Sequence, residues 1–378
     1  MNVLVTGASR YVGAHLAARL AAHPRVERVT GFDIVPPAGR LRDLLAEHDV
    51  AVTTGRDRDG RGDGGVRDVV AAVTGGEVDA VAHMGVVSSP GAGGRPAMKE
   101  QNIIGTMQLL AACQATPGVS KLVVRSSTAA YGASFRDPAV FTETTPPTLV
   151  PRGGFAKDVI EIEGYVRGFT RRRPDVVTTV LRLAPFVGPD AETSLTRYFA
   201  LPVVPTVLGR DPRLQFIHTD DALELLVRSV VENHRGTYNV AGDGVLALSQ
   251  AIRLAGRVAL PVIEPGMNAF AALVRASGIA RFISHPLLRL PELSHDQLDL
   301  FVHGRVVDTR ALVEEFGFRP RDTQEAFADF IHGRDLHGSG FAALRPAAVT
   351  ALESVVRDGV RRVRGARTPR APEGRAGS

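Results

Sequence analysis

The apolar residues near the start of the chain predict a strand, a tight loop and a helix. Val3 to Val5 form a short continuous apolar run, which is typical of a parallel strand buried on both faces. Small residues fill the loop that follows, and Leu16 and Leu20 then recur at helical spacing. A second apolar stretch, residues 26–32, predicts a neighbouring strand that ends at Asp33.

Strand and helix patterns continue to alternate after Asp33. The predicted strands are 50–53, 80–83, 121–126 and 176–183, and the predicted helices are 66–73, 98–113, 156–169 and 221–231. This order predicts the α/β class, with a right-handed, doubly wound parallel sheet of the Rossmann type.

A chain of 378 residues exceeds one ordinary core, so we expect a main domain and a smaller lobe. Segments with regular patterns, 1–184 plus 214–241, predict the sheet domain. The proline-richer segments, 185–213 plus 242–335, predict a smaller C-terminal lobe that covers a substrate. Residues 336–378 are expected to form a helix with one apolar face, which packs on its own domain or on a partner subunit, and then a disordered, Arg-rich tail.

Composition and charge favour a protein without membrane spans, disulfides or a nucleic-acid-binding surface. Hydrophobic residues make up 44% of the chain, yet no apolar run reaches membrane-spanning length and no leader precedes the first strand, so we expect a cytoplasmic protein. The net charge of +5 comes from scattered arginines, with lysine only at Lys99, Lys121 and Lys157, and nucleic-acid binding by the tail is the weaker alternative. The single Cys113, in an apolar helical stretch, predicts a buried thiol and excludes an internal disulfide.

The first loop and the carboxylate after the second strand predict a dinucleotide site. Gly7 and Gly13 let a diphosphate approach the backbone at the N-terminal end of the first helix, where free N–H groups point outward. Asp33 follows about 20 residues later, where a carboxylate can bind both ribose hydroxyls of an adenosine. Asp57, in a polar glycine-containing loop, either contacts the adenine amino group or is solvated.

Six segments then occur in an order that is typical of one family. They are 6–13 (TGASRYVG), 82–85 (AHMG), 102–110 (NIIGTMQLL), 125–132 (RSSTAAYG), 181–189 (LRLAPFVGP) and 216–221 (FIHTDD). They resemble the NAD-dependent epimerase/dehydratase family of extended short-chain dehydrogenase/reductases, with UDP-glucose 4-epimerases and nucleotide-sugar dehydratases as well-known members. The resemblance covers roughly residues 1–332.

The resemblance implies a fold, a cofactor and a set of site residues. It implies a Rossmann domain that binds NAD, with no metal, and a nucleotide-sugar or other small-molecule substrate. The implied catalytic residues are Ser127, Lys157 and Asn102. The implied cofactor-binding residues are Thr6, Gly7, Arg10, Tyr11, Val12, Gly13, Asp33, Asp57, Met84, Gly85, Ser126 and Lys157.

Arg10 departs from the family loop, Thr-Gly-x-x-Gly-x-x-Gly, because it replaces the middle glycine. Its side chain either turns outward or meets an anion, which would be the diphosphate of the cofactor or the 2′-phosphate of NADP. Asp33 would repel a 2′-phosphate, so the sequence favours NAD and leaves NADP as the alternative.

The proton-transfer pair of the family is incomplete in this chain. In the family, a Tyr and a Lys one helical turn apart remove a hydroxyl proton from the sugar while hydride passes to the nicotinamide. Here Lys157 is present, but the residue four positions before it is Gly153. Ser127 stands at the position of the family's serine. Tyr131 and Tyr165 are the nearby phenols, and a small shift brings neither into the missing position.

The substrate side departs from the family as well. Pro185 replaces an asparagine that usually contacts the nucleotide sugar, and the usual Arg-Asp before the Phe-Ile-His segment is absent, with Arg213 one residue displaced. Arg213 and Arg182 each either meet a diphosphate or are solvated or ion-paired. For His218, which opens a helix, capping or packing is favoured over catalysis.

These features leave two classes of function. The first is an enzyme that uses NAD(P) in the oxidoreduction of a sugar-like or other secondary alcohol, with an atypical active site. The second is a non-catalytic protein that keeps the cofactor for a structural or redox-signalling role and acts through partners, a homodimer among the possible assemblies.

Overall fold

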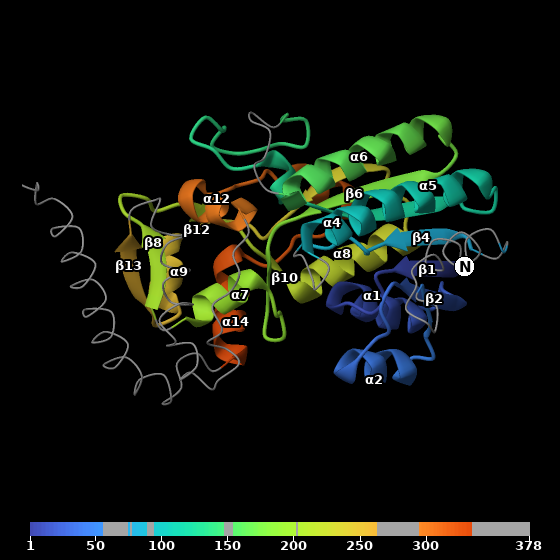
Figure 1. Cartoon of the computed structure of the whole chain (residues 1–378), viewed down its shortest axis with the longest axis horizontal. Helices are drawn as coiled ribbons and strands as arrows, with labels where there is room; N and C mark the ends of the chain where they lie inside the picture. The colour runs from blue at the N-terminus through green and yellow to red at the C-terminus, as the bar shows by residue number, and fades with distance from the viewer. Residues whose placement is uncertain are drawn as a thin grey trace, which may run out of the picture.

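The computed structural model describes residues 1–55, 75, 78–88, 94–146, 154–201, 203–262 and 295–334. In these residues a seven-stranded parallel sheet has the strand order β11-β6-β5-β4-β1-β2-β3 (Figure 1). Its strands are β1 (Asn2–Thr6), β2 (Arg28–Asp33), β3 (Ala51–Thr54), β4 (Ala80–His83), β5 (Lys121–Ser127), β6 (Val177–Leu183) and β11 (Gly236–Val240). The prediction of a doubly wound Rossmann-type sheet is confirmed.

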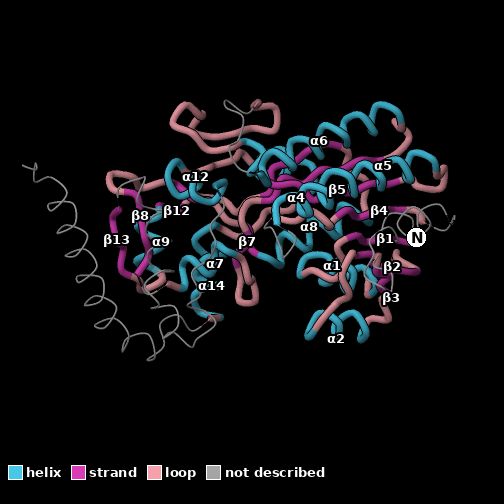
Figure 2. Tube along the Cα trace, viewed as in Figure 1, coloured by secondary structure: helices cyan, strands magenta, loops and turns pink. Residues whose placement is uncertain are grey.

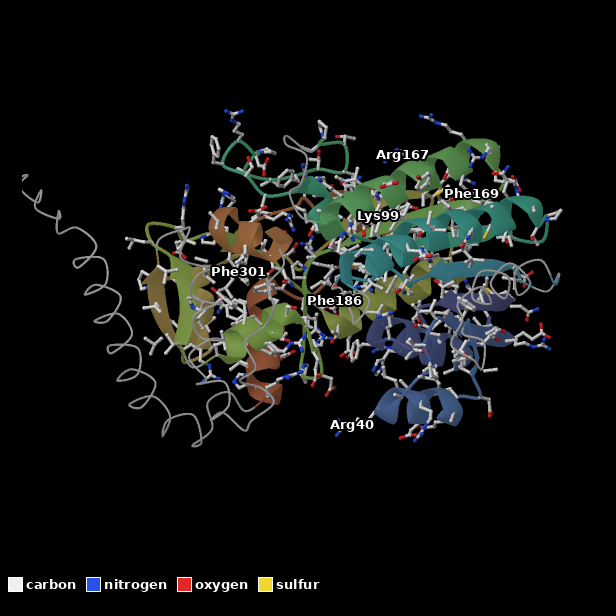
Figure 3. All side chains as sticks on the ribbon, viewed as in Figure 1. Arg40, Lys99, Arg167, Phe169, Phe186 and Phe301 are labelled. Atoms are coloured by element: carbon white, nitrogen blue, oxygen red, sulfur yellow. The ribbon has the colours of Figure 1, made fainter. Side chains whose placement is uncertain are left out.

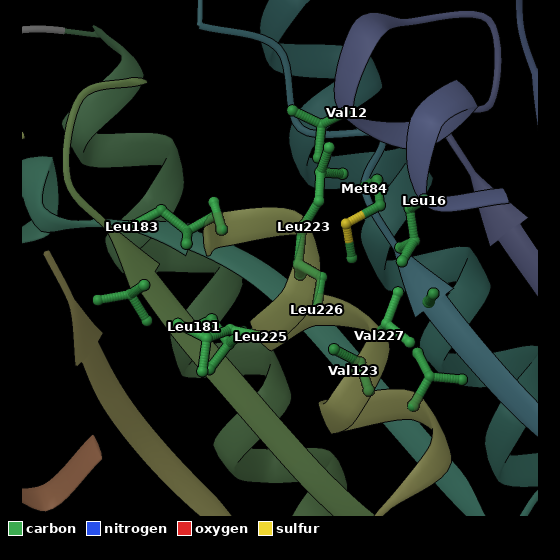
Figure 4. Packing of buried hydrophobic residues seen from close by; sticks show 14 of the residues in the cluster. Val12, Leu16, Met84, Val123, Leu181, Leu183, Leu223, Leu225, Leu226 and Val227 are labelled. Atoms are coloured by element: carbon green, nitrogen blue, oxygen red, sulfur yellow. The ribbon is translucent and has the colours of Figure 1, made fainter. Parts of the chain in front are cut away.

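The strands are apolar on both faces because helices cover both faces of the sheet. On β1, Val3 and Val5 pack with α1 (Tyr11–Ala21) and α8 (Thr219–Val231). Leu4, which lies between them, packs in the opposite layer with α5 (Gly105–Ala115) and α6 (Gly154–Arg172). Figure 4 shows the first of these layers, in which the packed side chains include Leu16, Leu223, Leu226, Val123 and Leu181.

A second, smaller core lies beside the sheet domain (Figures 1 and 2). Its elements are α7 (Ser194–Ala200), β8 (Val203–Val207), α9 (Leu248–Leu254), β13 (Val258–Val262), α12 (His295–His303) and α14 (Thr323–Gly333). Aromatic rings fill it, and the ring of Tyr198 stacks on that of Phe301 with centroids 4.0 Å apart. Figure 3 shows Phe301 in this lobe and Phe186 between the two cores.

Shorter elements complete the described chain. They are α2 (Gly39–Glu47), α4 (Gly94–Lys99), the π-helical turn η1 (Glu100–Ile104), the 3-10 turn η2 (Thr128–Tyr131), β7 (Phe186–Val187), β9 (Arg213–Leu214), β10 (Ile217–His218), β12 (Leu246–Ala247) and α13 (Arg310–Phe316). The predicted single helix 98–113 is therefore divided by η1, which Asn102 occupies. The edge strand β11 and the helix α2 were not predicted from the apolar pattern.

Some of the sequence predictions fall outside the described residues, namely the helix 66–73, Asp57, Gly153 and the C-terminal segment 336–378. The exact domain boundaries stay a prediction. Cys113 is buried within α5, as its apolar neighbours indicate. Among the described helices, none has the length and apolarity that a membrane span requires.

Candidate cofactor and active site

The loops after β1 and β4 meet at the point where the strand order reverses. Gly7, which follows β1, has a φ of +72°, and a Cβ atom there would lie 2.7 Å from the Cα atom of Gly85. A Cβ atom on Gly13 would lie 2.1 Å from the carbonyl oxygen of Gly7. Only glycine fits at these two positions, because the loop, the start of α1 and the end of β4 touch one another. In doubly wound folds, ligands bind in the crevice at this switch point.

The N-terminal end of α1 offers free backbone donors at the same place. Arg10 is the N-cap residue of α1, and no side chain caps the helix. The N–H group of Ala14 bonds to the carbonyl of Arg10, so the earlier N–H groups of Tyr11 and Val12 lack partners within the helix. With the helix dipole, these groups fit the diphosphate of a dinucleotide.

Asp33 ends β2 beside this loop and is only 2% exposed. Its carboxylate accepts hydrogen bonds from the N–H groups of Ser9 (3.1 Å) and Ile34 (2.7 Å). Burial raises the pKa of Asp33, and the charge of Arg10, whose Nε lies 3.8 Å from the carboxylate, opposes that rise. A carboxylate has further lone pairs, so Asp33 can still accept hydrogen bonds from the hydroxyls of a ribose. Arg10 thus faces Asp33 in this structure instead of turning outward.

The hydroxyl of Thr6 is directed into the sheet domain. Its Oγ1 lies 2.8 Å from Nδ1 of His83, and Nε2 of the same imidazole lies 2.9 Å from Oγ1 of Thr106 on α5. These bonds connect β1, β4 and α5. The side chain of Thr6 therefore anchors the start of the glycine loop to β4 and, through His83, to α5.

Acid is expected to weaken the fold through His83. Burial lowers the pKa of His83 to about 4, whereas an unfolded histidine titrates near about 6.5. The unfolded chain then binds a proton that the folded chain does not. The free energy of unfolding should fall as the pH is lowered from about 6.5 to about 4, by up to about 1.4 kcal/mol per pH unit.

Urea unfolding at pH 7 and pH 5 measures this effect. In His83→Gln the pH dependence should shrink, and in the control variant His332→Gln, which changes an exposed histidine, it should persist. An unchanged pH dependence in the His83 variant would contradict the assignment to that residue.

Asn102 joins the end of β4 to the start of α6. Its side chain is 1% exposed; Oδ1 accepts from the N–H of Val87 (2.8 Å), and Nδ2 donates to the carbonyl of Val87 (2.9 Å) and to Asp158 (2.9 Å). Arg95 pairs with the same buried Asp158 and donates to the carbonyl of Gly154 (2.9 Å). The amide of Asn102 therefore positions the segment that begins with Met84 and Gly85.

Neighbouring serines at the end of β5 have different partners. Ser126 is buried and donates to Oε1 of Glu163 at 2.6 Å. Ser127 caps η2 by accepting from the N–H of Ala129 at 3.1 Å. Because only an acceptor position of the Ser127 hydroxyl is used by this bond, its O–H can still donate to a substrate.

Lys157 lies in the first turn of α6, and its side chain is exposed. The two nearby phenols are engaged elsewhere. Tyr131 is 1% exposed, and two acceptors lie within hydrogen-bond distance of its single O–H, namely Oδ1 of Asn239 (2.7 Å) and the carbonyl of Thr142 (3.0 Å). Burial raises the pKa of Tyr131, which disfavours the phenolate. Tyr165 bonds to its helix neighbour Glu161 instead (3.1 Å).

Three residues were considered on the substrate side. Two of them bond to other residues of the protein, and the third is exposed. Arg182 on β6 forms an ion pair with Glu163 on α6 (2.6 Å), so it links the sheet to that helix. His218 caps α8 by accepting from the N–H of Asp220 (3.2 Å). Arg213, in contrast, is exposed in β9.

A cavity of about 390 Å³ lies beside Arg213, between the loop after η2, the β8–β9 loop and the segment after α12. Arg210 and Arg305 also line it, together with Asp137 and Asp211. Sequence reasoning had singled out Arg213 alone. Arg125 on β5, whose pKa the charge of Arg10 lowers, was not assigned a role from the sequence, although it opens the segment 125–132, because the resemblance of that segment rests on its serines and tyrosine.

The glycine loop, the free end of α1 and the carboxylate after β2 define a dinucleotide-binding Rossmann domain. The model of the NAD dependent epimerase/dehydratase family matches residues 3–241. The chain belongs to this family.

Other proteins resemble the chain over most of its length. An uncharacterised protein of Mycobacterium tuberculosis is 42% identical over 336 residues, which is 88% of this chain and 84% of that protein. A solved structure of UDP-glucuronic acid 4-epimerase from Bacillus cereus in complex with NAD superimposes with a TM-score of 0.61 at 16% identity, over 88% of this chain and 99% of that chain. For dTDP-glucose 4,6-dehydratase from Bacillus anthracis in complex with NAD, the TM-score is 0.63 at 16% identity, over 90% and 98%. At 16% sequence identity, these two superpositions establish that the chain has the same fold.

Proposed function

We propose that the protein binds NAD and catalyses reversible oxidoreduction at a secondary alcohol of a nucleotide sugar or a similar small molecule. The observation that carries the proposal is the geometry at the switch point. Gly7 and Gly13 let the loop after β1 pack closely against the end of β4 and the start of α1, the uncapped end of α1 offers N–H groups, and Asp33 stands beside the loop at the end of β2. The NAD complexes of the epimerase and the dehydratase with the same fold support this choice of cofactor.

When bound, the nicotinamide would supply hydride transfer. Around it, Ser127 can donate its free hydroxyl hydrogen to a substrate oxygen, and the exposed ammonium of Lys157 can donate to the nicotinamide ribose. A proton acceptor is missing from position 153, since glycine has no side chain. The substrate itself or a water molecule then has to take the proton.

The substrate proposal rests on the chemistry of the cavity beside β9. Arg210 and Arg213 could bind the diphosphate of a nucleotide sugar, and the two aspartates there could accept hydroxyl hydrogens. The named substrates of proteins that share the fold are nucleotide sugars, which is consistent with this chemistry.

A non-catalytic role is the second candidate function, although the proteins that share the fold are named as epimerases and dehydratases and do not favour it. The family's phenol is absent at Gly153, and Tyr131 is buried and hydrogen-bonded away from solvent. These facts suit a protein that binds NAD(P) without turnover, in a structural or redox-signalling role.

One experiment separates the two functions. The purified protein is saturated with NAD, nucleotide sugars are added in turn, and absorbance near the band of reduced nicotinamide is recorded. Reduction of bound NAD supports the enzyme, whereas tight binding without reduction by any sugar supports the non-catalytic role. Absence of NAD and NADP binding in calorimetry would refute both.

Asp33→Ala is expected to weaken NAD binding about 10- to 100-fold, because charge-assisted hydrogen bonds to the adenosine ribose are lost. Isothermal titration with NAD and with NADP measures the change. Asp43→Ala, which removes an exposed carboxylate of α2, is the matched control and should leave both affinities unchanged. Equal NAD affinity in the Asp33 variant and the unmodified protein would place the ribose elsewhere.

A further inference from the structure

Two arginines lie at the carboxyl edge of the sheet without a strong partner. Arg125, near the end of β5, donates one long hydrogen bond of 3.4 Å to the carbonyl of Val86, and its guanidinium lies 5.4 Å from the centre of the Phe186 ring. Among the described residues, no carboxylate pairs with it. A half-buried cation of this kind normally has an anionic partner, because desolvation of an unpaired charge is costly.

Arg10 is also incompletely satisfied. Its Nε is buried and has no hydrogen-bond acceptor among the described residues, and its distance of 3.8 Å from Asp33 is that of a loose ion pair. Asp33 already accepts two backbone N–H groups at shorter distances. The guanidinium of Arg10 therefore keeps donors free for another acceptor.

The charges of these two arginines act on each other. Burial and, as the smaller effect, the positive charge of Arg10 together lower the pKa of Arg125 to about 10. Two cations that repel each other in a partly buried place favour the binding of an anion between them.

The order of the strands indicates which anion fits. Arg10 follows β1, whereas Arg125 is on β5, on the opposite side of β4. A 2′-phosphate on the adenosine ribose would lie at Asp33, after β2, and thus on the side away from Arg125. The diphosphate of a bound dinucleotide would instead lie over the end of α1, on the side of β1 that faces β4, and Arg125 is on the strand beyond β4.

We propose that Arg10 and Arg125 bind the diphosphate of the dinucleotide from two sides, with Arg10 turning from Asp33 to a phosphate oxygen when the cofactor binds. This inference rests on the proposed function, since it assumes that a dinucleotide occupies the switch point. The release of Asp33 leaves its carboxylate free for the ribose hydroxyls. In this chain an arginine pair thus replaces the close contact that a middle glycine would give to the diphosphate.

The test compares ligands that do and do not carry a diphosphate. NAD, ADP and adenosine are titrated into the unmodified protein, Arg125→Met, Arg10→Met and the double variant. Both single variants should lose about tenfold or more in affinity for NAD and ADP and should keep their affinity for adenosine. Arg42→Met, which changes an exposed arginine of α2, is the control and should bind all three ligands normally.

Thermal unfolding without ligand gives a second readout. Arg125→Met should unfold at the same or a higher temperature than the unmodified protein, because an unpaired, partly buried charge is replaced by an apolar side chain. A lower melting temperature together with unchanged NAD and ADP affinity would overturn the proposal and make Arg125 a packing residue. Weakened binding of a nucleotide sugar alone would overturn it too, since the anion would then belong to the substrate. If the unmodified protein binds no dinucleotide, the proposed function itself fails.

Discussion

Gly153→Tyr is expected to raise the rate of UDP-glucose/UDP-galactose epimerisation by about 10²- to 10⁴-fold, which is the usual contribution of a general acid or base. The unmodified protein should turn over slowly or not at all. Position 153 precedes Lys157 by four residues, one helical turn, so a phenol and the ammonium can lie on the same side of a helix. The ammonium would then lower the pKa of the phenol toward the working pH.

A phenylalanine at the same position provides the control. Gly153→Phe adds the ring without the hydroxyl, so a gain that appears only with tyrosine reports proton transfer and not packing. The rate of Gly153→Tyr should also rise with pH as the phenol ionises, which a structural effect would not produce. If the unmodified protein already epimerises at rates normal for the family, the missing phenol does not limit the reaction.

The first strand–loop–helix unit could be predicted in full because its signals are local. Val3 to Val5 are buried, the space around Gly7 and Gly13 excludes a Cβ atom, and Asp33 ends the next strand. Each of these features depends on residues that are close in the sequence or on a fixed spacing. The prediction of the fold class and that of the cofactor follow from the same unit.

Other features could not be predicted, because they depend on contacts between segments that are far apart in the sequence. The strand β11, with Thr237 and Asn239 among its residues, lacks a continuous apolar run because it is an edge strand. The helix predicted at 98–113 is interrupted at Asn102, whose amide bonds to Val87 in the loop after β4. Arg125 was overlooked for the same reason, since its relation to Arg10 exists only in the folded sheet.

The sequence left Arg182 as a diphosphate ligand, a solvated side chain or a member of an ion pair; the structure shows the ion pair, and no local signal identified its partner, Glu163. Glu163 on α6 accepts from Arg182 on β6 at 2.6 and 2.9 Å and from Ser126 on β5 at 2.6 Å. Arg182 also donates to the hydroxyl of Tyr131 at 2.7 Å. Burial disfavours the charge of Arg182, but its hydrogen bonds and the charge of Glu163 outweigh that effect and raise its pKa. The arginine that resembled a phosphate ligand therefore orders the end of β5, which carries Ser127.

Glu163→Ala is expected to lower the free energy of unfolding by about 3–5 kcal/mol, because the guanidinium of Arg182 stays buried without its anion. Urea unfolding measures this loss. Arg167→Ala is the matched control: Arg167 lies 3.8 Å from the same carboxylate but is 63% exposed, so its removal should cost less than about 1 kcal/mol. Figure 3 shows Arg167 at the outer side of α6.

The double variant Glu163→Leu/Arg182→Met separates two possible causes of the instability of Glu163→Ala. One is the loss of the hydrogen bonds and the attraction, and the other is the guanidinium left buried without an anion. Since both charges are replaced by apolar side chains of similar size, most of the stability lost in Glu163→Ala should return. Tyr131 and Ser126 each lose a hydrogen-bond partner in the double variant, so the recovery should be incomplete. If the double variant is as unstable as Glu163→Ala, the cost comes from those hydrogen bonds and not from the stranded guanidinium. A loss in Glu163→Ala no larger than that in Arg167→Ala would mean that water reaches Arg182 once its partner is removed.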